Sequence, residues 1–230
     1  MHLNTVLTGA IAAAATFSTA LAGRGHGRYE PDLRVPRCPK KATATYDKSV
    51  PDKKRFPRTE VDLCYDNDSM HFTFKAFEEK YFYYDPKQGT NDDIWQYEVM
   101  EAFIQAGDKD PSTYLEFEVN PGNTTYQAII YNPAKDRTGA FDHLFVSTPA
   151  ADGFSSATAI NRKAETWVSQ VRIPIKLFNV DDARNTRWRM NFFRTVTNKE
   201  MFPNQDLGAW SVPNEASFHI SRFFKHVLFV

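Results

Sequence analysis

Apolar and polar residues alternate along most of the chain after residue 58, and this period of two restricts the fold more than any other feature. Val61, Leu63 and Tyr65 alternate with acidic residues and a cysteine. A second alternating segment, from Met70 to Ala76, follows a turn-forming stretch at 66–69. Successive side chains of a strand point to opposite faces, so each segment predicts a strand with one buried face. Together the two segments predict a hairpin.

Strand-like segments continue to the end of the chain, and only one segment favours a helix. The further strands are expected at 97–104, 113–119, 126–131, 166–173, 187–194 and 223–230. The helix is a short one near Pro174 to Asp182. No internal repeat and no proline- or glycine-rich linker interrupts 59–230. Many strands with few helices predict an all-β fold, an antiparallel β-sandwich or jelly roll with one short helix.

Residues 1–22 differ from the rest of the chain and predict a signal peptide. They contain no Asp, Glu, Lys or Arg, carry an apolar stretch, and end in Ala20-Leu21-Ala22, the small-x-small pattern of a cleavage site. An apolar helix of the folded domain is the alternative. Because no stretch of 18 or more apolar residues occurs, no transmembrane helix and no membrane partner is expected. We therefore expect a secreted, extracellular protein.

Secretion determines how the two cysteines and two glycosylation motifs are interpreted. An oxidising compartment favours a disulfide between Cys38 and Cys64, and two free buried thiols are the alternative. Asn67 and Asn123 each begin an Asn-x-Ser/Thr motif in a polar, turn-like stretch. We expect both asparagines to be glycosylated.

The formal net charge is zero, but the charge is unevenly distributed. Residues 23–58 contain 11 basic and four acidic residues, together with prolines at 31, 36, 39, 51 and 57. This segment is predicted to be an irregular basic arm lying on an acidic domain at 59–230. A separate polyanion-binding arm is the alternative. Neutrality of the whole chain argues against a nucleic-acid partner.

The motifs of several common enzyme classes are absent. The chain has no glycine-rich phosphate loop, no Gly-x-Ser-x-Gly and no His-Glu-x-x-His. No two of its six histidines have metal-ligand spacing, so a zinc site is not expected. Carboxylates are plentiful, and a glycosidase needs only two of them in one cleft. Catalysis by a carboxylate pair therefore stays open.

Trp95 occupies an unusual place, because the polar segment 91–94 delivers it to the start of a predicted strand. Glu98 and Glu101 follow it on that strand. An exposed Trp beside carboxylates suits a sugar, since the ring stacks on the C–H face of a pyranose and the carboxylates accept bonds from its hydroxyls. Burial of Trp95 in the core is the alternative.

Several sequence blocks, taken in order, resemble carbohydrate-binding module family 9, which belongs to the wider DOMON-like β-sandwich superfamily. The blocks lie at 61–66 with the 70–76 strand, Trp95-x-x-Glu98-x-x-Glu101, 117–121, 167–174, 188–194, 209–211 and 218–230. The chain is most similar to the secreted single-module branch of the family, over about residues 45–230. The resemblance implies a non-catalytic protein that binds cellulose, xylan or a related plant or cell-wall polysaccharide, or an oligosaccharide.

The resemblance also implies roles for individual residues. Family members hold a sugar between two aromatic rings, with a Glu bonded to its hydroxyls. Trp95 matches the first ring and Glu101 the Glu, while Phe218 stands where binding members have a second Trp. Glu118 stands where they have an Arg, which reverses the charge. The full set of candidate sugar-binding residues is Trp95, Glu98, Glu101, Arg194, Trp210, Asn214 and Phe218.

The sequence also leaves open two other functions, a glycoside hydrolase and a haem-binding domain, and a calcium site. A glycoside hydrolase would use Glu98 and Glu101 as its carboxylate pair. A haem-binding DOMON-like domain would use Met100 with His143 or His219 as axial ligands. No cofactor is expected, although calcium sites occur in the family and Asp66, Asp68, Asp92 and Asp93 are suitable oxygen ligands. We expect the protein to be a monomer.

Overall fold

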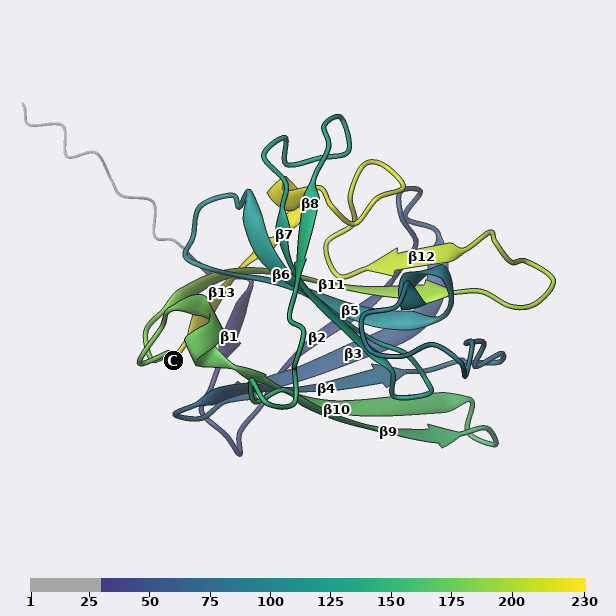
Figure 1. Ribbon diagram of the computed structural model, residues 1–230, viewed down its shortest axis with the longest axis horizontal. Helices are drawn as coiled ribbons and strands as arrows, with labels where there is room; N and C mark the ends of the chain where they lie inside the picture. Colours follow the sequence, from purple (N-terminus) through teal and green to yellow (C-terminus); the bar gives the residue numbers. More distant parts are fainter. Residues whose placement is uncertain (1–29) are drawn as a thin grey trace, which may run out of the picture. The chain divides into compact units, whose positions relative to one another are not determined.

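Two β-sheets pack face to face in the structure, a computed structural model that describes residues 30–230 (Figure 1). The smaller sheet is antiparallel and has the order β2 (Ala42–Lys48), β3 (Arg55–Tyr65), β4 (Ser69–Ala76), β10 (Thr166–Pro174) and β9 (Ser155–Asn161). The larger sheet has the order β1 (Leu33–Val35), β13 (Lys225–Phe229), β11 (Arg187–Val196), β5 (Val99–Ala106), β6 (Thr113–Val119), β7 (Thr125–Tyr131) and β8 (Asp142–Phe145). A further strand, β12 (Asp206–Ala209), pairs with β11. The predicted all-β antiparallel sandwich is confirmed.

The helical content of residues 30–230 consists of three short 3₁₀ turns. They are η1 (Ile94–Gln96), η2 (Ile175–Phe178) and η3 (Ser221–Phe223). The helix predicted near Pro174 to Asp182 is thus the single turn η2, which ends where Asn179 adopts a left-handed backbone. No helix in this part of the chain has the length and apolar character needed to cross a membrane.

The prediction of an irregular arm over 23–58 is wrong for the portion that the structure describes, because β1 and β2 lie in the two sheets. Ala44 and Tyr46 of β2 are buried, and the residues beside them are exposed. This alternation rests on only two apolar side chains, one of them small, which made the strand hard to recognise. The compact unit begins at residue 31 rather than at 59. The predicted signal peptide lies outside the described residues.

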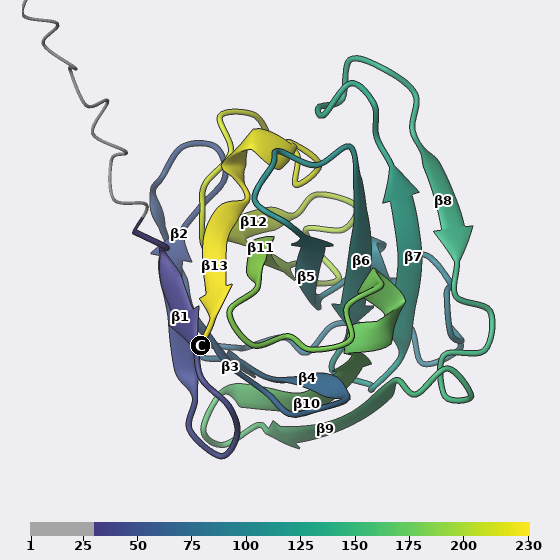
Figure 2. The same ribbon diagram turned by 90° about the vertical axis from the view of Figure 1, so that its left-hand side faces the viewer.

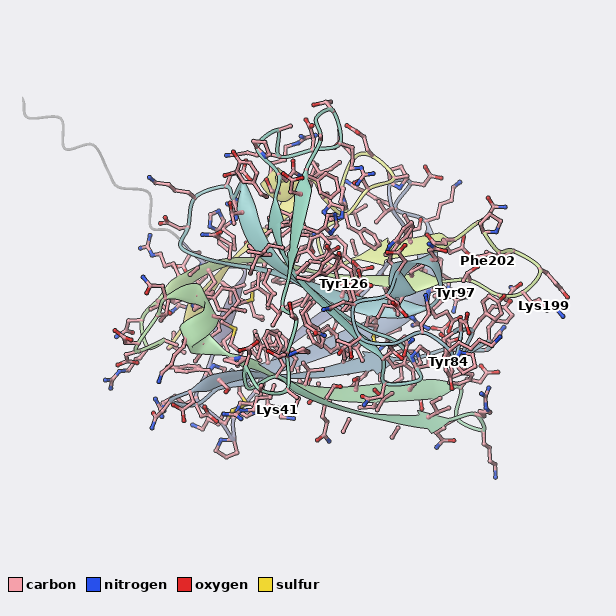
Figure 3. The ribbon with its side chains drawn as sticks, viewed as in Figure 1. Lys41, Tyr84, Tyr97, Tyr126, Lys199 and Phe202 are labelled. Atoms are coloured by element: carbon pink, nitrogen blue, oxygen red, sulfur yellow. A yellow bond between two sulfur atoms is a disulfide. The ribbon has the colours of Figure 1, made fainter. Side chains whose placement is uncertain are left out.

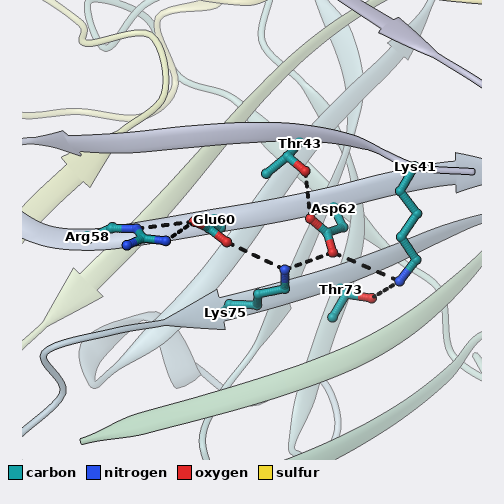
Figure 4. A network of polar contacts seen from close by, with 7 residues as sticks. All are labelled: Lys41, Thr43, Arg58, Glu60, Asp62, Thr73 and Lys75. Carbon is teal, nitrogen blue, oxygen red and sulfur yellow. Dashed lines mark hydrogen bonds and ion pairs between the residues drawn. The ribbon is translucent and has the colours of Figure 1, made fainter.

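Basic and acidic side chains form a network across β3, β4 and the residue before β2, and two of its basic residues, Lys41 and Arg58, come from the basic segment (Figure 4). Arg58 contacts Glu60, and Lys75 lies 2.8 Å from Asp62 and 3.5 Å from Glu60. Lys41 lies 3.9 Å from Asp62. These pairs cover the outward face of β3 and β4. Ion pairs that solvent can reach contribute about 0–1 kcal/mol each, so this network adds little to the stability of the sheet.

The predicted disulfide is confirmed, since Cys38 and Cys64 are bonded. The bond joins the segment after β1 to β3, where the chain passes from the larger sheet to the smaller one. The backbone N–H of Cys38 also donates to the carbonyl of Tyr65 (2.9 Å).

The larger sheet is buried on both faces, and this positions the site. Its inner face packs against the smaller sheet through a large core that includes Met100, Phe117 and Phe192. Its outer face carries a second cluster that includes Phe103 and Phe193. Phe218 and Phe224, which come from either side of η3, belong to this cluster. Figure 2 shows the strands of the sheet side by side, from β1 and β13 through β5 to β7 and β8. Strands β5 and β6 are therefore buried almost without alternation.

Candidate functional site

A cavity of about 810 Å³ lies on the outer face of the larger sheet. Its floor comes from β5 and β6, one wall from β7 and β8, and the opposite wall from the ends of β11 and β12 and the segment 215–219. The residues that line it are Asp93, Trp95, Glu101, Glu116, Glu118, Tyr126, Arg137, Phe141, His143, Phe145, Thr195, Gln205, Leu207, Glu215, Ala216, Ser217, Phe218 and His219. Tyr126 is labelled in Figure 3.

Three glutamates form the polar floor of the cavity. Glu101 of β5 is the cross-strand partner of Glu118 on β6. Glu116 lies two residues before Glu118, so strand geometry places it on the same face. One carboxylate oxygen from each glutamate lies within 4.8 Å of the other two, and all three side chains are buried. Three buried acids thus lie side by side on the cavity floor.

Burial and mutual repulsion make the charged forms of these carboxyls unfavourable. Burial, followed by the charge of Glu116, raises the pKa of Glu101 well above its ordinary value. Burial, followed by Glu101 and Glu116, does the same to the pKa of Glu118. Burial raises the pKa of Glu116 to about 8, against the opposing influence of Arg137. Without a positive charge among them, the surroundings favour the neutral, protonated forms of these carboxyls.

Two histidine–tyrosine pairs stand beside the glutamates. Nδ1 of His219 lies 2.8 Å from the hydroxyl of Tyr114, and its Nε2 lies 3.5 Å from Glu116. Nδ1 of His143 lies 2.5 Å from the hydroxyl of Tyr126. Burial, with Arg137 next, lowers the pKa of His219 to about 3 and also lowers that of His143. Both imidazoles are neutral at pH 7 and can therefore accept as well as donate.

Trp95 lies at the rim and is 48% exposed. Its segment is fixed to β7 by Asn91, whose left-handed backbone (φ 66°) lets it donate to Val146 and accept from the N–H of Gln127. Gln205 donates to the carbonyl of Trp95 (2.7 Å) from the opposite wall. The indole is therefore held in place while its ring stays open to solvent, as a ring that stacks on a ligand must be.

Phe218 lines the same cavity but is only 9% exposed. Its ring stacks on Phe193 with the centroids 4.2 Å apart, so one face of Phe218 belongs to the outer core cluster. A smaller cavity of about 140 Å³ shares Trp95 and Gln205 with the main one. Its lining includes Phe202, whose ring stacks on Tyr97 (Figure 3).

Two of the predicted sugar ligands, Glu98 and Arg194, lie in the protein interior and do not line the cavity. Arg194 forms a buried ion pair with Glu79 (2.8 Å) and donates to the carbonyl of Phe77. Burial, followed by the charge of Glu79, raises the pKa of Glu98 to about 10. Because both side chains are fully buried in this separate network, we leave them out of the proposed sugar site.

Trp210 and Asn214 are also outside the cavity lining. Trp210 stacks on Phe192 (5.4 Å), a residue of the core between the sheets, and Lys225 lies over its ring. Asn214 is exposed and accepts from Arg222 (2.8 Å). Of the seven predicted residues, the structure thus brings together Trp95, Glu101 and Phe218.

The aspartates that were candidates for calcium do not converge. Asp66 uses its oxygens within its own turn, on the N–H groups of Asp68 and Ser69 and on His71. Asp92 accepts from the N–H of Gly89. In residues 30–230 the acidic cluster able to hold a metal ion is Glu101, Glu116 and Glu118.

The haem alternative is wrong in the ligand pair that it named. Met100 points into the core between the sheets, whereas His143 and His219 line the cavity on the opposite face of the larger sheet. A methionine and a histidine on opposite faces cannot ligate one iron. For the hydrolase alternative, Glu98 does not share a cleft with Glu101, whereas Glu116 and Glu118 do.

Of the three glutamates on the cavity floor, sequence reasoning named Glu101 and Glu118 but missed Glu116. Glu116 and Glu118 alternate with Leu115, Phe117 and Val119 in a strand that is otherwise apolar. Acids repeated on one face of a buried strand are a signal that could have identified Glu116. Nothing in the sequence joins the glutamates to His143 and His219, which come from β8 and from a distant loop.

Comparison of sequences identifies a relative but no named family model, since none of the models searched matches the chain. A protein of Arthroderma benhamiae described as "Extracellular protein" is 56% identical over 204 residues, which cover 88% of this chain and 92% of the relative. The chain belongs to the same family as this extracellular protein.

Comparison of structures supports a fold like that of carbohydrate-binding module family 9. A Bacteroides uniformis protein described as a candidate carbohydrate-binding protein has a TM-score of 0.65 at 15% identity, covering 86% of this chain and 98% of its own. A family 9 module from Caldicellulosiruptor kristjanssonii, in complex with cellotriose, has a TM-score of 0.57 at 10% identity and covers 86% and 92%. The complex of a family 9 module from the same organism with glucose has a TM-score of 0.54 at 10% identity and covers 80% and 83%.

Proposed function

We propose that this protein binds a polysaccharide or oligosaccharide in the 810 Å³ cavity, without catalysis. The observation that carries the proposal is the exposed indole of Trp95 above a floor of buried carboxyl groups. The indole offers a flat apolar surface to the C–H face of a sugar ring, while the glutamates and neutral imidazoles offer hydrogen-bonding partners to its hydroxyls. Structural neighbours solved with cellotriose and with glucose support a plant or cell-wall glucan as the first ligand to test.

Substitution of Trp95 tests this proposal directly. Trp95→Ala removes the stacking surface, and we expect binding to insoluble cellulose, xylan or β-glucan to weaken about 10- to 100-fold, equivalent to about 1–3 kcal/mol. Because the ring is half exposed, the melting temperature should change little. Retention in pull-down assays and affinity electrophoresis measures the first effect, and thermal denaturation the second.

Tyr131→Ala is a matched control, since Tyr131 is an aromatic residue that is 53% exposed on β7 but does not line the cavity. It should leave retention unchanged. If Trp95→Ala retains full binding to a glycan that the native protein holds, or lowers retention no more than Tyr131→Ala does, the cavity is not the sugar site.

We also propose that the protein is secreted, with cleavage after Ala22 and glycans on Asn67 and Asn123. The extracellular description of the relative supports secretion, and both asparagines are exposed. Mass spectrometry of the exported protein should find Gly23 at the N-terminus and a mass loss at each asparagine after enzymatic deglycosylation. An intact Met1 in the exported chain, or unmodified asparagines, would contradict the corresponding part.

A further inference from the structure

The floor of the cavity contains carboxylate oxygens that no donor satisfies. Oε2 of Glu116 and Oε2 of Glu118 are buried and have no hydrogen-bond partner, although both side chains line the cavity. The exposed fractions of the two residues are 4% and 1%. Buried acceptors without donors carry a large desolvation cost, and most native structures supply them with a proton, a water molecule or an ion.

A protein cation could neutralise the glutamates, but none is in place. Among residues 30–230, no Lys or Arg forms an ion pair with Glu101, Glu116 or Glu118. The guanidinium of Arg137, which also lines the cavity, lies over the ring of Phe141, 4.7 Å from its centroid. A bound cation is one way to supply the positive charge that residues 30–230 do not place in this cluster.

One ring nitrogen of His219 is hydrogen-bonded and the other faces the glutamates, which is the arrangement of a metal-binding histidine. The hydroxyl of Tyr114 occupies its Nδ1, which leaves Nε2 facing the cluster at 3.5 Å from Glu116. In metal sites the second nitrogen of a ligating histidine is held by a hydrogen bond of this kind, which fixes the ring and its tautomer. The side chain of His219 is only 15% exposed, so the surrounding residues restrict its orientation.

We propose that Glu101, Glu116 and Glu118 bind a divalent transition-metal ion on the cavity floor, with Nε2 of His219 as a nitrogen ligand. Two oxygens on one ion lie at most twice the metal–oxygen distance apart, about 4–5 Å, and the three carboxylate oxygens lie within 4.8 Å of one another. Three carboxylates with one imidazole suit Zn²⁺ or Mn²⁺ better than Ca²⁺, which takes oxygen ligands.

The position of the ion gives it an open side. The glutamates bind it from the sheet, and the cavity lies on the other side, so a water molecule can complete the coordination. If the proposed function is right, a hydroxyl of the bound sugar can take the place of this water. Binding of the ion itself does not depend on a sugar.

Metal content of the purified full chain tests the proposal without any glycan present. After treatment with a chelator and equilibration with Zn²⁺ or Mn²⁺, elemental analysis should find one ion per chain, and the ion should raise the melting temperature. Glu118→Gln and His219→Ala should each weaken binding at least about 10-fold, and the double variant Glu101→Gln/Glu118→Gln should abolish it.

Glu98→Gln is the matched control, because Glu98 is an equally buried glutamate outside the cavity, and this variant should keep the ion. Thermal melting of each metal-free variant establishes that it is folded. The proposal is overturned if the native chain binds no ion, or if the double variant binds the ion as well as the native chain does. Protons would then be what neutralises the glutamates. Trp95→Ala should keep the metal while losing the glycan, so the metal site and the proposed function fail separately.

Discussion

At the scale of single residues, the neighbouring carboxyls of Glu79 and Glu98 show how hydrogen bonding decides ionisation. Glu79 accepts from Arg194 and from the N–H groups of Tyr81 and Phe82, and despite burial its pKa is lowered by these partners. Glu98 has no donor to either oxygen and is held protonated, with its pKa raised by burial to about 10.

This difference predicts a pH-dependent stability. Between about pH 5 and pH 8 the folded chain keeps the Glu98 proton that the unfolded chain releases, so the free energy of unfolding falls as pH rises, by about 1 kcal/mol per pH unit. Glu98→Gln removes the contribution of Glu98 to this slope, because an amide does not titrate. The free energy of unfolding, measured by urea denaturation, should therefore rise for Glu98→Gln relative to the native protein by about 3 kcal/mol in total between pH 5 and pH 8.

Glu79→Gln is the contrasting variant. It removes the charge that compensates Arg194 and should destabilise the protein at every pH in this range, by about 3–5 kcal/mol. A constant difference between Glu98→Gln and the native protein from pH 5 to pH 8 would mean that Glu98 has the same ionisation in the folded and unfolded chains.

At the scale of elements, the sequence predicted the inner strands of both sheets and missed the strands at their edges, β1, β2, β8 and β9. Alternation placed β6 at Thr113–Val119, as the structure has it. It missed β8, whose side chains are all exposed, and β12, which is only four residues long. The candidate site divides in the same way. Trp95 and Glu101 share one short segment, whereas His219 joins them only through tertiary structure that no local pattern encodes.

The strand β12 also offers a test of how the cavity wall is held. Gly208 lies against the buried ring of Phe56, and a Cβ at this position would overlap that ring. We expect Gly208→Ala to lower the free energy of unfolding by about 1–3 kcal/mol, as overpacking does, and to weaken sugar binding because Leu207 lines the cavity.

Gly89→Ala serves as the control for Gly208→Ala, since an added Cβ there would meet only Asp92 at an ordinary 3.8 Å. Chemical denaturation and glycan retention should be close to native for this variant. Native stability in Gly208→Ala would show that Phe56 moves aside without cost.

At the scale of the whole molecule, the two ends of the described chain are joined at one corner of the sandwich. Strand β1 pairs in parallel with β13, and the N–H of Val230 donates to the carbonyl of Val35 (2.9 Å). The carbonyl of Val230 accepts from the hydroxyl of Tyr65 on the smaller sheet (2.9 Å). The neighbouring disulfide ties the segment after β1 to β3.

Removal of the disulfide tests how much of the stability depends on this corner. Closing a loop between residues 26 apart restricts the unfolded chain, and the double variant Cys38→Ser/Cys64→Ser should lose about 3 kcal/mol, or about 6–12 °C in melting temperature. Reductant should lower the melting temperature of the native protein similarly and leave the variant unchanged. Glycan binding below the melting transition should persist, because the bond lies outside the cavity lining. An unchanged melting temperature would mean that β1 and β13 hold the corner without the covalent bond.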